Sequence, residues 1–315
     1  MHPAYSVILF TTASGTGYGL LVWLGVLSAI GTLPASRWFG FTGLALSLGL
    51  ITVGLLASTF HLGHPERAWR AFSQWRSSWL SREGVAAVAT YVPAGLFGIG
   101  WVFLERTDGV FALFGLIAAA LALVTVYCTG MIYASLRTIR QWHQPLVPWV
   151  YIALALATGA MLMLALIHVF GMESTWFSYV TAALIALALL LKQRYWATID
   201  NEKKTWTIGD ATGLGKHGQV RMLDPPHTQA NYVMREMGYA VARNHAEKLR
   251  RLVRLVAFLV PGALCLITVV PMEFLAAPAA VLAVLTAAVG VAVERWLFFA
   301  EAEHVSMLYY GRPAA

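Results

Sequence analysis

The chain has 315 residues, of which 59% are hydrophobic and only 12% are charged, and its mean hydropathy is +0.67. Soluble globular domains carry about twice this charged fraction and lack uninterrupted apolar runs of about 20 residues. The composition therefore excludes a soluble enzyme, a disordered protein and a nucleic-acid-binding domain, although the net charge is +7. We expect a polytopic membrane protein whose excess positive charge lies in loops facing the cytoplasm.

Apolar runs long enough to cross a bilayer recur along the chain and predict an all-α integral membrane protein, a bundle of eight transmembrane helices. The predicted spans are residues 6–33, 38–60, 83–104, 109–135, 148–171, 176–196, 250–271 and 276–300. Pro34 follows the first span and Pro148 opens the fifth. A polar, charged insert at 197–249 separates the sixth and seventh spans. We expect one membrane domain over 1–315, with this insert as a cytoplasmic docking segment.

An even number of spans places both termini on the same side of the membrane. That side also receives the connections around 61–82, 136–147 and 197–249, which carry most of the lysines and arginines. The opposite side carries only Arg37 and Arg106. Because cytoplasmic loops are enriched in Lys and Arg, we expect both termini to be cytoplasmic, in the inner membrane of a bacterium.

The densest group of ionisable residues follows the second span. His61 stands where that helix meets the interface, and Glu83 opens the third helix, with Ser81 as its expected N-cap. A histidine and a carboxylate between two helix ends can exchange protons with a bound quinone, whose reduction needs two protons as well as two electrons. We include His64, Arg67 and Ser81 in this predicted quinone site. The alternative is an ordinary interface, where tryptophans form an aromatic belt and arginines meet lipid phosphates.

The cysteines and histidines do not form the pattern of a metal or haem site. Both cysteines lie in apolar stretches, and zinc or an iron–sulfur cluster usually needs about four ligands. Of the nine histidines, only His168 lies near the non-cytoplasmic face, so no pair lies deep within two spans. We expect no metal and no haem bound by this chain. The alternative is a haem at the cytoplasmic edge, between His61 and either His304 or His143.

Three further features have both a functional and a structural interpretation. Glu294 and Arg295 lie inside the last span. They form either a proton route or a pair in which each residue satisfies the charge and hydrogen bonds of the other, and we favour the pair. Small and hydroxylated residues in the first span are typical of close helix packing. Residues 229–249 are predicted to be helical and to dock a partner, the alternative being a helix that lies along the headgroups. The residues expected to contact a partner are Arg70, Arg76, His227, Tyr232 and Arg235.

The stretch His61-Leu-Gly-His-Pro65, followed by Ser78-Trp-Leu-Ser-Arg-Glu83, resembles the membrane anchor subunits of dimethyl sulfoxide reductase-type molybdoenzymes. The resemblance covers most of the chain. It implies an anchor without metal or haem that binds a quinone, ubiquinone or menaquinone. It also implies two partners, an iron–sulfur electron-transfer subunit and a molybdopterin catalytic subunit. His61 and Glu83 match positions implicated in quinol binding in that family.

Two departures from the dimethyl sulfoxide reductase anchor are the cytoplasmic docking face and the longer insert with Leu223-Asp-Pro-Pro-His227. Both are more similar to the anchor of the cytoplasmic sulfite-oxidising complex. The resemblance thus implies the membrane subunit of a sulfite:quinone oxidoreductase, with the sulfur chemistry in the partner. Three alternatives stay open: the anchor of a sulfoxide or oxyanion reductase that oxidises quinol, an anchor without a quinone site, and a secondary transporter.

Overall fold

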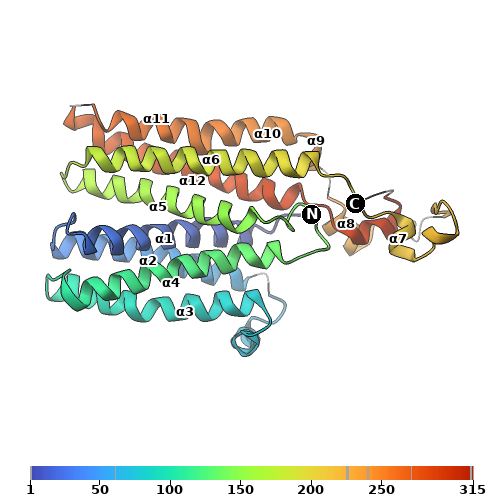
Figure 1. Cartoon of the computed structure of the whole chain (residues 1–315), viewed down its shortest axis with the longest axis horizontal. Coiled ribbons are helices and arrows are strands. Elements are labelled where there is room, and N and C mark those ends of the chain that lie inside the picture. Colours follow the sequence, from blue (N-terminus) through green and yellow to red (C-terminus); the bar gives the residue numbers. More distant parts are fainter. Residues whose placement is uncertain are drawn as a thin grey trace.

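The computed structural model describes residues 2–60, 62–224, 227–239, 241–270, 272–312 and 314, and for residues 241, 242 and 273 it describes the backbone only. These residues form an all-α protein with two isolated β-bridges. Figure 1 shows the long helices running side by side, with α7 and α8 beyond one end of the bundle.

Seven helices in the described part of the chain are long and apolar enough to cross a membrane. They are α1 (Tyr5–Ala29), α2 (Arg37–Thr59), α3 (Trp79–Gly98) with its π-helical continuation η2 (Ile99–Phe103), α4 (Gly109–Ala134), α5 (Val147–Val169), α6 (Thr175–Asn201) and α12 (Glu273–Ala300). The chain is therefore a multi-pass membrane protein, as its composition predicts.

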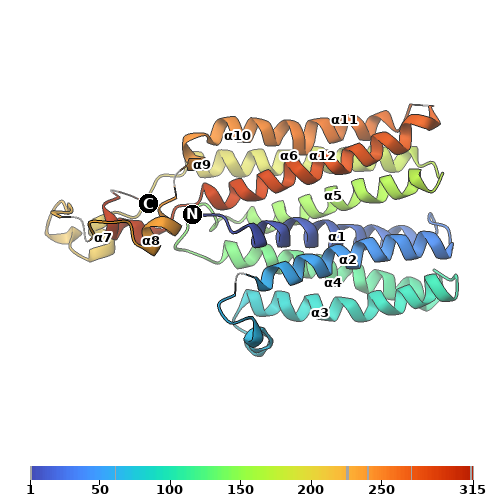
Figure 2. The same cartoon turned by 180° about the vertical axis from the view of Figure 1, so that it is seen from behind.

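The segment predicted as the seventh of eight spans is helical but interrupted. It consists of α10 (Ala246–Val253), the π-helical η4 (Arg254–Leu259) and α11 (Val260–Ile267), which pack against α6 and α12 (Figure 2). Pro261 explains the interruption, because proline has no N–H and its ring clashes with the carbonyl four residues earlier. None of the three pieces is long enough to span a bilayer alone, so the structure gives seven candidate spans where we predicted eight.

Six short helices complete the chain, and most of them lie beyond one end of the bundle. They are η1 (Pro65–Gln74), α7 (Ile208–Thr212), η3 (Gly215–His217), α8 (Tyr232–Met237), α9 (Val241–Asn244) and η5 (Val305–Tyr310). Residues 229–249, predicted to be helical, contain α8, α9 and the start of α10 as separate elements.

Both termini lie at this same end of the bundle (Figures 1 and 2). The N–H of His2 donates to the carbonyl of Glu236 at 2.7 Å, and bridges join Ile139 to His304 and Thr207 to Ala314. We call this the polar end. It comprises the described residues of 2–4, 62–78, 135–146, 202–245 and 301–314.

Helix α1 lies at the centre of the bundle and packs against α2, α4 and α5. Gly19 of α1 faces the backbone of Ala155 and Gly159 of α5 so closely that a Cβ atom at Gly19 or Gly159 would overlap the other helix. The packing interpretation of the small residues in the first span is confirmed at these positions. This close contact fixes the hydroxyl-bearing part of α1 beside α4 and α5.

Candidate functional site

A cavity of about 700 Å³ opens at the polar end, between the ends of α1, α2, α3 and α4 and the η1 segment. Its apolar walls include Val7, Phe10, Leu55, Phe72, Leu80, Ile132, Trp142 and Phe299. Its polar wall residues are His2, Ser58, Thr59, His64, Arg67, Glu83 and Tyr133. A large apolar cavity with a few polar groups is the usual form of a small-molecule site.

The start of α3 carries Glu83 into this cavity. The N-cap is Ser78, whose hydroxyl accepts a hydrogen bond from the Ser81 N–H at 3.4 Å. The prediction that Ser81 caps the helix was therefore wrong, and Glu83 lies in the second turn rather than at the opening. Ser81 is buried, and its hydroxyl donates to the carbonyl of Ala71. Its role is thus to hold η1 against α3, beside the cavity.

Glu83 is only 4% exposed, and no ion pair reaches it from the described residues. Its carboxyl group contacts the hydroxyl of Thr129 on α4. That hydroxyl also lies 3.0 Å from the carbonyl of Thr125. Because Thr129 has one hydroxyl hydrogen, it can donate to a Glu83 carboxylate, or donate to Thr125 while accepting from a Glu83 carboxylic acid. Both protonation states of Glu83 are therefore hydrogen-bonded.

The mouth of the cavity carries exposed charged groups. His64 Nδ1 lies 3.0 Å from Glu66, and Arg67 Nε lies 3.7 Å from the same carboxylate. Both His64 and Arg67 are more than half exposed and line the cavity. The fourth ionisable residue of the predicted quinone site, His61, lies outside the described residues. The structure thus brings Glu83, His64 and Arg67 to one cavity.

The predicted docking residues are all at the polar end, but on two different segments. Arg70 lies over the ring of Trp69 and Arg76 over that of Trp75, both on or beside η1. The other three belong to the insert. His227 stacks on Tyr310, Tyr232 is exposed at the start of α8, and Arg235 lies near the end of α8.

Sequence reasoning missed a charged cluster inside the bundle. Glu294 pairs with Arg295 as predicted, with Oε2 2.5 Å from the Arg295 Nε. Its other oxygen, Oε1, lies 2.5 Å from Nζ of Lys192 on α6. All three side chains are at most 2% exposed. We call this cluster the triad. Lys192 gave no signal in the sequence, because a lysine near the end of an apolar run usually snorkels to the interface.

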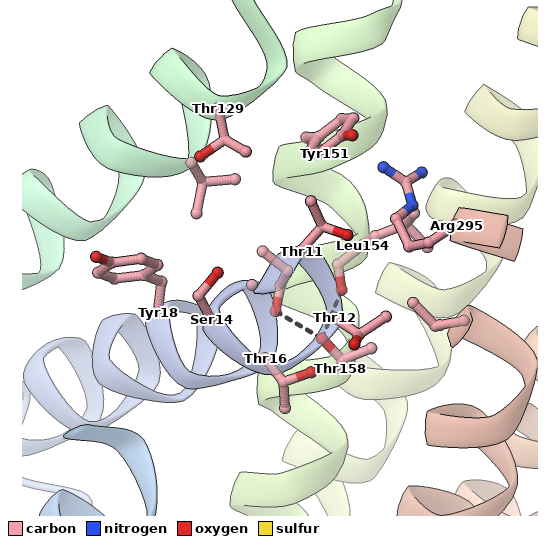
Figure 3. Close-up of a pocket in the computed structure, with 14 residues that line it drawn as sticks. Thr11, Thr12, Ser14, Thr16, Tyr18, Thr129, Tyr151, Leu154, Thr158 and Arg295 are labelled. Atoms are coloured by element: carbon pink, nitrogen blue, oxygen red, sulfur yellow. Dashed lines mark hydrogen bonds between the residues drawn. The ribbon is translucent and has the colours of Figure 1, made fainter. Parts of the chain in front are cut away.

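The triad borders a narrow polar crevice between α1, α4, α5 and α12. Figure 3 shows Thr11 and Ser14 of α1, Thr129 of α4, Tyr151 of α5 and Arg295 of α12 around it. Thr129 thus faces the crevice while also touching Glu83. Across the described residues, no group of three His, Cys, Asp or Glu side chains is placed to hold a metal ion.

Comparison with known proteins gives a consistent result. The family model described as DMSO reductase anchor subunit (DmsC) matches residues 1–311. The chain is 33% identical over 329 aligned residues to the C subunit of sulfite dehydrogenase from Allochromatium vinosum, covering 98% of this chain and 99% of that protein. It is 25% identical over 164 residues to the anaerobic dimethyl sulfoxide reductase chain YnfH of Escherichia coli, covering 52% of this chain and 57% of that protein. It is 26% identical over 145 residues to the C chain of the anaerobic dimethyl sulfoxide reductase of the same organism, covering 45% and 49%.

Proposed function

Because this chain belongs to the DMSO reductase anchor subunit (DmsC) family, and is thus the membrane anchor subunit of a molybdoenzyme complex, we propose that it passes electrons from sulfite oxidation to a membrane quinone. The similarity to a sulfite dehydrogenase subunit extends along nearly all of both proteins, whereas the similarity to the sulfoxide reductase chains covers about half. This difference supports sulfite as the electron donor. The sulfur chemistry belongs to a molybdopterin subunit, and an iron–sulfur subunit delivers the electrons.

The observation that carries the proposal is the apolar cavity with Glu83 in its wall. A quinone ring needs apolar surfaces above and below, and hydrogen-bonding groups for its two oxygens. The cavity of about 700 Å³ supplies the first through side chains such as Phe72, Leu80 and Phe299. It supplies the second through Glu83, Arg67 and His64. The residues present therefore fit a quinone head group.

Reduction of a quinone to a quinol consumes two electrons and two protons. The electrons come from the iron–sulfur subunit at the polar end. We assign one proton transfer to Glu83, because Thr129 satisfies its carboxyl group before and after the proton leaves. We assign the other to His61, because histidine is the side chain whose charge changes near neutral pH. Arg67 and His64 at the mouth attract the developing negative charge on the quinone oxygens.

We also propose the topology. The α10–η4–α11 segment packs along α6 and α12 and serves as the eighth crossing, which is consistent with both termini lying at the polar end. The cationic connections gather at that end, so it faces the cytoplasm. The insert at 197–249 and the arginines of η1 then dock the iron–sulfur subunit there.

A second function is favoured by the family model itself, which is named for a sulfoxide reductase. In that case a quinol would bind the same cavity and give its protons to Glu83 and His61, and electrons would leave toward the partner. The site is the same in both directions. The two functions are distinguished by two assays of the purified complex. One measures quinone reduction with sulfite as the electron donor, and the other measures sulfoxide reduction with a quinol as the electron donor.

The test of the quinone site is Glu83→Gln in the purified complex. We expect sulfite-to-quinone turnover to fall by about 100-fold, the lower range for loss of a proton-transfer group. Sulfite oxidation with ferricyanide, which takes electrons upstream, stays unchanged. The matched control is Glu173→Gln, an exposed carboxylate at the opposite end of the bundle. If both activities fall together in Glu83→Gln, the site assignment is wrong.

A further inference from the structure

Three buried polar groups belong to residues that line the crevice shown in Figure 3 and make no well-aligned hydrogen bond to the described residues. They are the hydroxyl of Tyr18, the hydroxyl of Tyr151 and the terminal nitrogens Nη1 and Nη2 of Arg295. Buried polar groups are almost always paired, with protein or with ordered water. Three such groups at one crevice indicate that something polar occupies it.

The size of the crevice suits a single water molecule. The space open to the centre of a water molecule is about 20 Å³, slightly more than one water requires. A buried water needs two to four polar partners, and the lining residues offer the Tyr151 hydroxyl, the Arg295 guanidinium and the hydroxyls of Ser14 and Thr129. No larger ligand fits this volume.

The crevice has an acidic neighbour on one side and a cationic one on the other. Thr129, in its wall, touches Glu83. Arg295, in the opposite wall, belongs to the triad, whose formal charges sum to +1 when Lys192 and Arg295 are protonated and Glu294 is ionised. An isolated charge inside a membrane bundle is costly unless an opposite charge offsets it. Within the described spans, Glu83 is the other fully buried carboxyl group.

We propose that water in this crevice couples Glu83 to the Lys192–Glu294–Arg295 triad, which serves as the counter-charge of the Glu83 carboxylate. The proposal rests on the proposed function. When the Glu83 carboxyl group gives its proton to a quinone oxygen, a carboxylate is left, and the triad offsets it until a proton from the polar end restores the acid. The triad keeps its own protons throughout, so Lys192, Glu294 and Arg295 are positioning residues.

The other charged and titratable groups near Glu83 and Glu294 do not supply a counter-charge for the Glu83 carboxylate. Glu83 is faced by the neutral side chains of Tyr18, Cys128, Thr129, Tyr133 and Tyr151, and Tyr91 lies on its own helix. Arg82 points away, with its guanidinium over Trp79 and bonded to the carbonyls of Trp75 and Arg76. Arg67 lies at the exposed cavity mouth and pairs with Glu66. Beyond the triad, Glu301 pairs with Arg250, which also pairs with Asp200.

The charge count predicts opposite effects for two substitutions. Lys192→Met lowers the charge of the triad from +1 to 0, and Glu294→Gln raises it to +2. A more positive triad stabilises the carboxylate of Glu83, whereas quinone reduction requires its acid form. The pH at which quinone reduction falls to half its maximum therefore moves up in Lys192→Met and down in Glu294→Gln. Each shift is roughly half to one pH unit, as for one charge acting at an effective dielectric constant of about 20.

The double variant Lys192→Met/Glu294→Gln is the control, because its triad has a charge of +1 again. We expect its half-maximal pH to return to that of the wild type, even if all three variants are less stable. A triad with a purely structural role would lower the melting temperature and leave the three pH profiles superimposed. That result would overturn the proposal.

Binding of a hydroxyquinoline N-oxide, an analogue of quinone, separates this inference from the function on which it rests. If the wild-type complex does not bind the analogue, the proposed function fails. If the complex binds it, and the half-maximal pH is the same in all variants, only the counter-charge inference fails. For Glu294→Gln, retained analogue binding also shows that the purified protein is folded.

Discussion

Among the described side chains of the membrane-spanning helices, two carboxyl groups are buried, those of Glu83 and Glu294, and their surroundings differ sharply. Glu294 is held between Lys192 and Arg295, each 2.5 Å away. Glu83 has a hydroxyl, that of Thr129, and no ion pair from the described residues. A carboxylate between two cations resists protonation, whereas one beside a hydroxyl that can both donate and accept is satisfied in either state. Burial alone therefore does not identify a proton-transfer group. The hydrogen-bond and ion-pair partners of the carboxyl group determine whether it can gain and lose a proton.

The largest expected effect on folding stability comes from removing the salt-bridged carboxylate of Glu294. Glu294→Ala leaves two buried cations without an anion, which costs about 3–5 kcal/mol of folding stability. Glu83→Ala removes a carboxyl group that has no ion pair with the described residues and whose direct polar partner is the Thr129 hydroxyl, and we expect it to cost less than about 2 kcal/mol. Thermal unfolding of the two variants in detergent measures the difference. Equal destabilisation would show that the two environments are not as different as their contacts indicate.

Much of this architecture could be predicted from the sequence, because apolar runs of bilayer length report helices directly. The interrupted α10–η4–α11 segment could not be seen in that way. Its apolar run continues through Pro261, while the backbone changes from α-helical to π-helical at η4, just before that proline. The position of Glu83 near the second helix also followed from the sequence. Its partner Thr129 did not, because the contact joins α3 to α4 across 46 positions and depends on packing.

The charged cluster shows the same limit. The pairing of Glu294 with Arg295 follows from their being neighbours in the chain. Lys192 lies on a different helix, and a lysine with the same flanking sequence can equally reach the headgroups. The triad and its crevice depend on the packing of α5 against α12 and on the reach of Lys192 from α6 to Glu294, neither of which the sequence displays.

A smaller effect is expected from changing the partner of Glu83. Thr129→Val keeps the volume of the side chain and removes the hydroxyl, so Glu83 loses its hydrogen bond to Thr129 in both protonation states. We expect sulfite-to-quinone turnover to fall by about tenfold, equivalent to one lost hydrogen bond of about 1.4 kcal/mol. Oxidation of sulfite with ferricyanide should not change.

The matched control is Thr181→Val, a buried threonine of α6 whose hydroxyl donates to the carbonyl of Phe177 at 2.8 Å. It removes a hydroxyl of the same kind far from the cavity. Quinone turnover in Thr181→Val should stay within about twofold of the wild type. If Thr129→Val behaves in the same way as Thr181→Val, the hydroxyl of Thr129 has no part in proton transfer.

The smallest effect concerns a third carboxylate, Glu303 at the polar end, which resembles Glu294 in its partners but lies outside the spans. It is surrounded by Lys204 at 2.7 Å, Arg312 at 3.0 Å and Arg243 at 3.4 Å. Burial raises the pKa of Glu303, but these cations outweigh burial and hold the pKa below its usual value. A depressed carboxyl pKa gives stability that is complete above the unfolded pKa, about 4.3, and is lost as the pH falls. Glu303→Gln should therefore cost about 1–2 kcal/mol at pH 7, and little at pH 3. Melting temperatures across this range test the sign, since a difference that grows toward acid pH would show that burial and not the cations dominates at Glu303.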